Sequence, residues 1–360
     1  MPNIVYDQLK GFCYSREDES RTLRPRGVTI TSGFDMIPWD DLVPPVLIPQ
    51  SLNEVEIDRV DDRRKKSKQE KKQERQQKKI NVARKKKLER QMVESKEQEF
   101  NPIIIEGQIQ KLYNKILKMA NISKDKDLKL FQYHSIAVYK SDVDYLLPGE
   151  WLNDNDISLI YEMLTQLIVN NLEIKFGKQV QLLYPTLVQL FLHYPNSDDI
   201  ESILPIDDLK SLKFIFIPIN FIDDYDQVDL EDANQGDHWA LAIFSVLESR
   251  IYLYDSMSLD DDSDSDKKLL QELTKRIISC KNIVKTNKIE CFRMKCDQQM
   301  NFDDCGVYVL MITCFMMKRL LLDQDGTKIN MDISNIKYNP LLARYTMIDL
   351  VHRLYTLNVQ

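Results

Sequence analysis

Apolar side chains recur with two different periods along residues 109–360, and each period predicts a different kind of element. The spacing of Ile109, Leu112, Tyr113, Ile116 and Leu117 is that of one face of an amphipathic helix. The same period predicts helices over residues 151–172, 267–280, 305–322 and 340–355. Runs rich in β-branched and aromatic residues predict strands at 136–139, 213–219, 239–244, 250–255 and 289–294. Strands clustered between helices predict an α+β domain with a small, mixed central sheet.

The first hundred residues lack this periodicity and divide into two parts. Residues 1–60 mix proline, glycine and short apolar runs, which predicts mostly irregular structure. Residues 61–100 contain no proline or glycine and few apolar residues, so they form either a solvated helix or a disordered linker. The predicted organisation is therefore an irregular segment over 1–60, a basic linker over 61–105 and one folded domain over 106–360.

Charge is distributed unevenly between these parts. Residues 63–90 hold 15 Lys and Arg against 3 Glu, whereas the rest of the chain holds 34 basic and 53 acidic residues. The runs RRKK at 63–66 and RKKK at 84–87 are typical of nuclear-import signals. No aromatic residue is interleaved with these charges, which argues against a surface that stacks nucleic-acid bases. Acidic stretches at 223–232 and 260–266 are predicted to be surface loops.

Composition excludes several classes of protein. With 43% hydrophobic residues the chain can bury a core, and only 9 of its 360 residues are glycine. No apolar run reaches the roughly 18 residues of a membrane span, and the N-terminus lacks the pattern of a signal peptide. Six cysteines in a chain of this length do not make a disulfide framework. We therefore expect a soluble protein of the nucleus or cytoplasm, with free thiols and no metal or cofactor.

Cys305 is the cysteine with the clearest chemical setting. It follows Asp304, precedes Gly306 and begins the long apolar helix predicted over 305–322. The positive end of a helix dipole stabilises a thiolate, and free backbone N–H groups there can hold an oxyanion. The alternative is a buried cysteine on a core helix, which is also our interpretation of Cys280, Cys291, Cys296 and Cys314.

A nucleophilic cysteine needs a base, and His238 is the best placed of the four histidines. His193 and His352 lie in helical patterns without an evident acidic partner, whereas His238 begins the strand 239–244. The next strand ends at Asp255, and a short turn makes the two strands an antiparallel hairpin. The hairpin brings Asp255 and His238 to the same end of the sheet, where the carboxylate could orient the imidazole. The alternative for Asp255 is a simple turn former.

Together these residues resemble the ubiquitin-like-protein proteases, the Ulp and SENP type of cysteine peptidase. The resemblance covers roughly residues 130–325. It is carried by His238-Trp239, Asp255, Gln299-x-Asn301-x-x-Asp304-Cys305-Gly306, the upstream Trp151-Leu152-Asn153-Asp154, and the strand Phe216–Asn220. It implies a papain-like α+β fold with His238 as general base, Asp255 as its orienting group and Cys305 as nucleophile. It further implies that Gln299 donates to the oxyanion, that Trp151 and Trp239 cover a narrow tunnel for a Gly-Gly tail, and that Asp154 helps to hold this tail.

The sequence is most similar to the deneddylase branch, which acts on the Rub/Nedd modifier. The stretch from Ser141 to Asp154 and the element Tyr254-Asp255-Ser256-x-Ser258 carry this likeness, and Asp237 beside His238 departs from the family pattern. The implied function is cleavage after the terminal Gly-Gly, either to mature a precursor or to release the modifier from a conjugate. The alternatives are a SUMO-specific protease of the same mechanism and a catalytically silent module that binds a modifier. The acidic body favours a modifier with a basic face.

Overall fold

The computed structural model describes most of the chain after residue 100 and short pieces before it. The described residues are 4–7, 12–15, 29–37, 39–41, 101–120, 128–171, 174, 177–193, 204, 211–221, 238–257, 264–281, 283–284, 288–322 and 329–359. The basic block at 63–90, the acidic stretch at 223–232 and Asp237 lie outside these ranges.

The described residues belong to two compact units. One unit joins residues 1–43 with 108–360, and the other comprises residues 44–107. Helix α3 (Pro102–Met119) begins in the second unit and continues into the first. It confirms the amphipathic helix predicted from residue 109 onward, because Ile109, Leu112 and Ile116 are buried. The Tyr113 hydroxyl donates to Asp144 at 2.8 Å.

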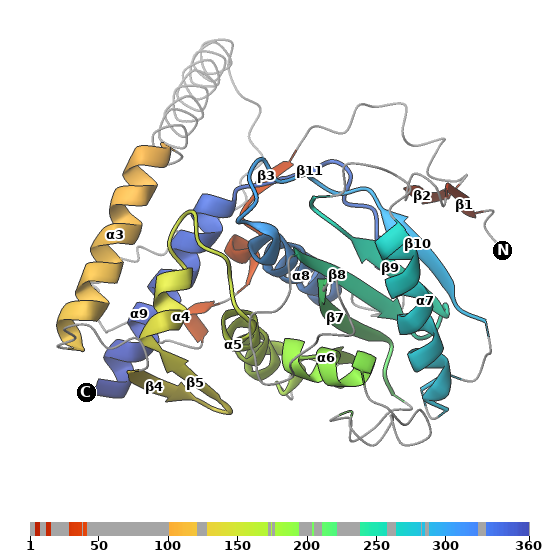
Figure 1. The fold of residues 1–360 in the computed structure, drawn as a ribbon, viewed down its shortest axis with the longest axis horizontal. Helices are drawn as coiled ribbons and strands as arrows, with labels where there is room; N and C mark the ends of the chain where they lie inside the picture. The colour runs from red at the N-terminus through yellow and green to blue at the C-terminus, as the bar shows by residue number, and fades with distance from the viewer. Residues whose placement is uncertain are drawn as a thin grey trace, which may run out of the picture. The chain divides into compact units, whose positions relative to one another are not determined.

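A five-stranded mixed sheet forms the centre of the larger unit (Figure 1). Its strand order is β10-β9-β8-β7-β6. The strands are β6 (Val180–Leu182), β7 (Phe214–Phe221), β8 (His238–Ser245), β9 (Arg250–Tyr254) and β10 (Glu290–Met294). The three central strands β7, β8 and β9 are antiparallel to one another, and the edge strands β6 and β10 pair in parallel with β7 and β9. This arrangement confirms the predicted mixed sheet, and the ends of β7 to β10 lie within two residues of those expected. Strand β6 was not predicted, and the strand predicted at 136–139 pairs in a separate hairpin.

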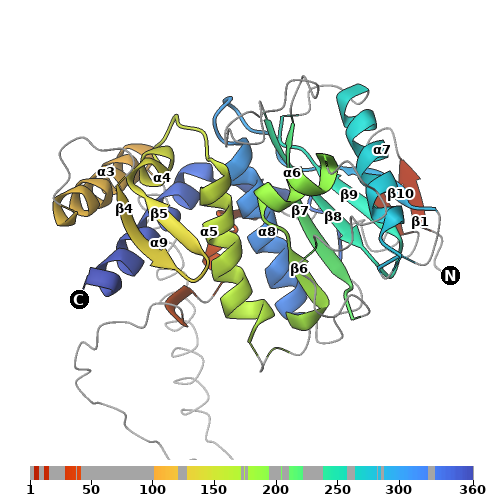
Figure 2. The ribbon, with the colours of Figure 1, turned by 60° about the horizontal axis from the view of Figure 1, so that its bottom comes forward.

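Helices cover both faces of this sheet. Alternate residues of β7 and β8, including Ile217 and Ala242, pack in one cluster with α6 (Pro185–His193) and α7 (Asp264–Ser279). Successive side chains of a strand point to opposite faces, so Trp239 lies on the other face. There it meets α8 (Cys305–Leu322), since a Cβ added to Gly306 would lie 3.3 Å from Trp239 Cδ1. Figure 2 shows α6 on one side of the strands and α8 on the other.

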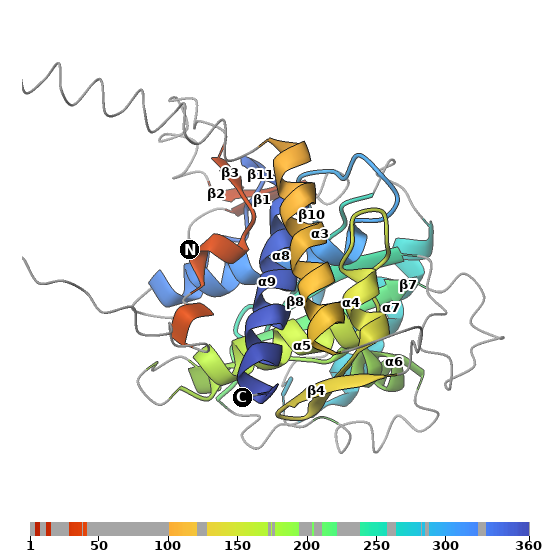
Figure 3. The same cartoon turned by 90° about the vertical axis from the view of Figure 1, so that its left-hand side faces the viewer.

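The remaining elements lie beside α8. They are the hairpin β4 (Lys129–Tyr133) and β5 (Ile136–Tyr139), α4 (Lys140–Tyr145), α5 (Asp154–Leu164) with the π-helical turn η3 (Thr165–Val169), the 3₁₀ turn η4 (Gly177–Gln179) and α9 (Pro340–Val359). Helix α9 runs alongside α8 (Figure 3) and stacks its Tyr355 ring on Phe131 of β4, with ring centroids 6.0 Å apart. None of the helices in the described ranges is long and apolar enough to cross a bilayer.

The N-terminal segment is more regular than its sequence predicts. Strand β1 (Ile4–Asp7) pairs with β2 (Phe12–Ser15), and β3 (Thr29–Thr31) pairs in parallel with β11 (Ile336–Tyr338). Two 3₁₀ turns follow, η1 (Phe34–Met36) and η2 (Trp39–Asp41). The elements are too short to show a period, and the partner of β3 lies more than 250 residues away in the chain. A second difference is that the acidic stretch at 260–266, predicted as a loop, already enters α7 at Asp264.

The segment around η1 lies directly against the helix that begins at Cys305. Phe34 is fully buried, and its ring stacks on Trp39 with centroids 5.8 Å apart. Gly33 has a φ of 75°, and an added Cβ would lie 2.3 Å from the carbonyl oxygen of Met311 in α8. Both observations show that Gly33, Phe34 and Trp39 are part of the core that supports α8, although the sequence placed them outside the folded domain.

We therefore predict that Phe34→Ala destabilises the domain by about 3–5 kcal/mol, the usual cost of truncating a buried phenylalanine. The measurement is the free energy of unfolding from denaturant titration. Leu247→Ala is the control, because Leu247 is exposed in the turn between β8 and β9, and its change should stay within about 0.5 kcal/mol. Equal small effects of the two substitutions would show that the segment does not support α8.

Candidate active site

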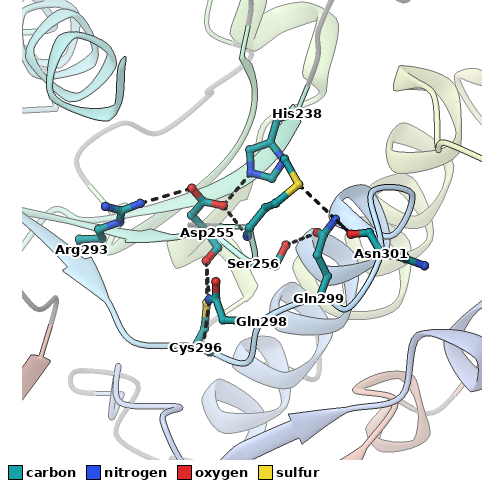
Figure 4. A network of polar contacts seen from close by, with 9 residues as sticks. His238, Asp255, Ser256, Arg293, Cys296, Gln298, Gln299 and Asn301 are labelled. Carbon is teal, nitrogen blue, oxygen red and sulfur yellow. Dashed lines mark hydrogen bonds and ion pairs between the residues drawn. The ribbon is translucent and has the colours of Figure 1, made fainter. Parts of the chain in front are cut away.

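His238 and Asp255 meet at one end of the central sheet, as the predicted hairpin requires. Leu241 of β8 pairs with Tyr254 of β9, so the residue that opens β8 and the residue that follows β9 lie at the same edge. His238 Nε2 lies 2.6 Å from Asp255 Oδ1 (Figure 4). Both side chains are largely buried, at 12% and 6% exposure, so water screens this interaction only weakly.

Asp255 is held as a carboxylate by neighbours on three sides. In addition to His238, the backbone N–H of Met257 donates to Oδ1 at 2.9 Å, and the Arg293 guanidinium lies 3.6 Å from Oδ2. Burial would raise the pKa of this carboxyl, but the bond to His238, the Met257 N–H and the charge of Arg293 together lower it below its ordinary value. Asp255 is thus kept ionised beside the imidazole.

The backbone of Asp255 is fixed as firmly as its side chain. Its carbonyl oxygen accepts from the Cys296 thiol at 3.2 Å and from Gln298 Nε2 at 3.0 Å. Figure 4 shows both residues beneath the carbonyl, on the segment that leads from β10 to α8. Sequence reasoning missed Arg293 and Gln298, because one arginine in a strand and one glutamine in a turn carry no signal of a distant partner.

The imidazole of His238 is oriented and charged by its surroundings. Its ring stacks on Phe221 of β7, with centroids 5.5 Å apart. Burial alone would lower the pKa of His238, but the hydrogen bond to Asp255 and the charges of Asp255 and Cys305 raise it to about 9. Because Nε2 is bonded to Asp255, Nδ1 is the nitrogen left to exchange a proton with a thiol. Nδ1 is buried, with no hydrogen-bond partner among the described residues.

Cys305 is the first residue of the 18-residue helix α8 and is 2% exposed. The next residue, Gly306, lies against Trp239, which directly follows His238, since an added Cβ would lie 3.3 Å from Trp239 Cδ1. The thiol is also among the groups that raise the pKa of His238. Leu152 packs closely on Gly306, because a Cβ added to this glycine would lie only 3.0 Å from Leu152 Cβ. A larger residue would therefore be crowded at this position. The structure therefore brings together the three residues predicted as nucleophile, base and orienting group. Cys291, Cys296 and Cys314 are also free thiols.

The two predicted tunnel tryptophans lie near this helix start but differ in exposure. Trp239 is buried, and its indole N–H donates to the carbonyl of Leu152 at 3.1 Å. Trp151 is 40% exposed, and its indole N–H lies 3.3 Å from an oxygen of Asp303, two residues before Cys305. One tryptophan thus forms an inner wall beside Gly306, and the other is open to solvent at the turn that precedes the thiol.

Asp154 has an unusual environment for a carboxylate. It is the first residue of α5 and is 6% exposed. Burial raises its pKa to about 7. Within the part of the chain that the structure describes, its Oδ1 has no hydrogen-bond partner. A buried acceptor without a donor is costly, so this oxygen is open to accept a bond from a further donor.

Gln299, the predicted oxyanion donor, is engaged in its own turn. Its Nε2 donates to the carbonyl of Asn301 at 2.7 Å and contacts the Met257 sulfur at 3.5 Å, while its Oε1 accepts from the Ser256 hydroxyl at 2.8 Å (Figure 4). The amide would have to exchange the Asn301 bond for one to an oxyanion. Its predicted role remains a prediction.

No group of three His, Cys, Asp or Glu side chains able to hold a metal ion occurs among the described residues. The polar atoms of the site are those of an acid–base pair and a thiol. A thiol at a helix start, an imidazole and an orienting carboxylate define the cysteine-protease class of site.

Comparison with known proteins gives the family. Residues 196–345 match the model of the Ulp1 protease family, C-terminal catalytic domain. His238, Asp255 and Cys305 all lie within this match. Over these residues the chain is similar to the Ulp1-family catalytic domain, the Ulp and SENP type that its sequence motifs predict.

Individual relatives are similar over part of their length. NEDD8-specific protease 2 of Schizosaccharomyces pombe is 29% identical over 222 residues, which is 61% of this chain and 49% of that protein. The probable sentrin-specific protease 8 of Dictyostelium discoideum is 29% identical over 236 residues, 64% of this chain and 92% of that protein. The chain thus spans about half the length of the fission-yeast relative.

Among solved structures, the C-terminal Ulp1 protease domain in complex with Smt3, the yeast orthologue of SUMO, covers 70% of this chain and 95% of its own. The two sequences are 20% identical, and the TM-score is 0.44.

The environment of His238 generates a direct test of the pair. We predict that NMR titration of the His238 ring gives a pKa near 9 in the native protein. Asp255→Asn removes both the hydrogen bond to a carboxylate and its charge, so the pKa should fall toward the ordinary value of about 6.5. His352, on α9, serves as the internal control and should not move. An unchanged His238 pKa in Asp255→Asn would contradict the pairing.

Proposed function

We propose that this protein is a cysteine protease that cleaves after the C-terminal Gly-Gly of a ubiquitin-like modifier, with Rub/Nedd as the preferred modifier. It would mature the precursor, release the modifier from lysine isopeptide bonds, or do both. The observation that carries the proposal is the bond of 2.6 Å between His238 and Asp255, made beside a thiol that opens a long helix within the matched catalytic domain.

In the proposed chemistry His238 acts first as a base and then as an acid in each half of the reaction. His238 takes the proton of Cys305 at Nδ1, and the thiolate attacks the carbonyl carbon of the terminal glycine. The oxyanion is held by the backbone N–H of Cys305 and by the Gln299 amide. His238 then gives its proton to the leaving amine, and a thioester forms. Water, deprotonated by the same imidazole, hydrolyses this thioester and regenerates the thiol.

Selection of the Gly-Gly tail follows from the surroundings of Cys305. Flat indoles on both sides can clamp an extended backbone that has no side chains, so residues larger than glycine are excluded. Trp239 is buried beside Gly306, and Trp151 lies over the turn that leads to the thiol. A backbone N–H of the tail could satisfy the open Oδ1 of Asp154.

The preference for Rub/Nedd has two supports. Relatives from fission yeast carry the name NEDD8-specific protease. Outside residues 63–90 the chain holds 34 basic and 53 acidic residues, and an acidic body favours association with a modifier that has a basic face. A SUMO-specific protease of the same mechanism is the alternative, since the catalytic residues do not distinguish the two.

The first functional prediction concerns the nucleophile. Cys305→Ala should abolish cleavage of a modifier carrying a fluorogenic C-terminal amide, while binding of the modifier persists, because the fold does not depend on this one thiol. Cys314→Ala is the matched control on the same helix and should cleave normally. A vinyl-sulfone derivative of the modifier should form a covalent adduct with the native protein. Reversible capture without an adduct would identify a silent binding module instead.

The second functional prediction concerns the modifier. Fluorogenic C-terminal conjugates of Rub/Nedd, SUMO and ubiquitin, tested side by side, should give the highest kcat/KM for Rub/Nedd. This value should fall as salt rises, because screening weakens attraction between opposite charges. A preference for SUMO at all salt concentrations would overturn the modifier assignment and leave the proposed catalytic residues in place.

A further inference from the structure

A single buried arginine links the two segments that form the candidate site. Arg344 lies in the second turn of α9 and is 1% exposed. Arginine has five N–H donors in a rigid, planar fork. The acceptors of Arg344 are Asp304 Oδ1 at 2.9 Å and the carbonyl oxygens of Tyr145 at 3.1 Å, Leu147 at 2.9 Å, Glu150 at 2.7 Å and Asp303 at 3.1 Å. Each of its five donors therefore has an acceptor.

These acceptors belong to two separate parts of the chain. Three carbonyls lie within residues 145–150, the segment that leads from α4 into Trp151. The other two acceptors belong to Asp303 and Asp304, the residues immediately before Cys305. The guanidinium therefore fixes the approach to Trp151 relative to the turn that presents the thiol. The Trp151 indole also contacts the turn before Cys305 directly, through Asp303.

The contacts continue from Asp304 along the turn to Gln299. Asp304 Oδ2 accepts from Asn301 Nδ2 at 2.9 Å, and the carbonyl of Asn301 accepts from Gln299 Nε2 at 2.7 Å. The cation of Arg344 is thus connected, through one carboxylate and one amide, to the side chain proposed to hold the oxyanion. A displacement of Asp304 would change the position of Cys305 by direct chain connection and that of Gln299 through these bonds.

We propose that Arg344 is a positioning residue for the reaction. It holds the turn before Cys305, formed by Asp303 and Asp304, in a fixed position relative to Trp151, without touching the substrate. The detailed claim about the Gly-Gly tail rests on the proposed function, whereas the claim about the thiol rests on the structure alone. Positioning of this kind is valuable because a misplacement of about 1 Å caused by a distant substitution can cost on the order of 10²-fold in rate.

Arg344→Lys is the informative substitution. Arg344→Ala would leave the Asp304 carboxylate buried without its cation, which destabilises proteins strongly and confuses folding with function. Lysine keeps the charge but supplies three donors from one point, so it cannot reach five acceptors in two segments. Arg353→Lys is the matched control, because Arg353 lies on the same helix and contacts Asp349, one turn earlier in α9, at 3.0 Å.

The first measurement does not depend on any modifier. Alkylation of Cys305 by iodoacetamide is followed by peptide mass spectrometry, at a temperature where circular dichroism shows all variants folded. The thiolate is the reactive form, and it depends on the position of Cys305 beside His238, so Arg344→Lys should slow alkylation about tenfold. Arg353→Lys should match the native rate. An unchanged rate in Arg344→Lys, with only a lower melting temperature, would show a merely structural role and overturn the proposal.

The second measurement uses the fluorogenic Rub/Nedd conjugate. Arg344→Lys should lower kcat on the order of 10²-fold with a smaller change in KM, because the tail still finds its walls but the thiol is misplaced. Combining it with Asp304→Asn should give a double variant about as slow as the slower single variant, because both act through one turn. Independent, multiplying effects would contradict the proposed connection. If the native protein cleaves no modifier, the proposed function fails, and the alkylation rates still decide the role of Arg344.

Discussion

The register between β8 and β9 is the constraint on which both the core and the site depend. Side chains alternate between the two faces of a sheet, so a slip of one residue would exchange every inward and outward position. In the observed register, Ala242 and Leu253 face the cluster with α6 and α7, and Trp239 faces α8. The same register sets His238 against Asp255. Burial of the core therefore selects the register, and the register supplies the catalytic geometry at no further conformational cost.

Charge is buried around the site, and most of it is compensated locally. Asp255 is neutralised by His238 and Arg293, and Asp304 by Arg344. Each compensating cation comes from a different element: the start of β8, β10 and α9. Removing one partner of such a pair leaves a costly unpaired charge. These ion pairs thus link β8, β10 and α9 at the site. The position of the Cys305 thiol therefore depends on several elements of the domain and not on α8 alone.

The loop before α5, which carries Trp151, is anchored at both of its ends. Its start is fixed by the carbonyl bonds to Arg344, and its end by the helix cap at Asn153, whose side chain accepts from the Asp156 N–H at 2.8 Å and donates to Asp142 at 2.9 Å. Trp151 lies between these two anchors. An exposed aromatic on a loop is usually mobile, whereas here the backbone on either side of it is held by buried polar groups.

Periodicity predicts the longer strands and helices of the larger unit, since their burial follows a repeating face, but it missed the shorter β4, β6, α4 and α6. The meeting of His238 and Asp255 followed from hairpin geometry, which depends only on neighbouring strands. The sequence did not predict β3 or the burial of Phe34, because their partners are distant and their own length is too short for a period. Arg344 escaped notice for a related reason: an arginine in a helix is ordinarily solvated, and only the folded chain shows five acceptors around it.

Asp154 differs from the other buried carboxylates in a way that fits a role in binding. Asp255 and Asp304 each have a cation and further donors from the chain, whereas Oδ1 of Asp154 has no donor among the described residues. With its pKa raised to about 7 by burial, Asp154 is divided near neutral pH between its charged and neutral forms. A backbone N–H donated by a bound tail would favour the charged form and lower this pKa. Part of the binding energy would then be used to ionise the Asp154 carboxyl, which burial keeps partly neutral in the free protein. In the proposed function, the open acceptor would favour ligands that supply an N–H at that point.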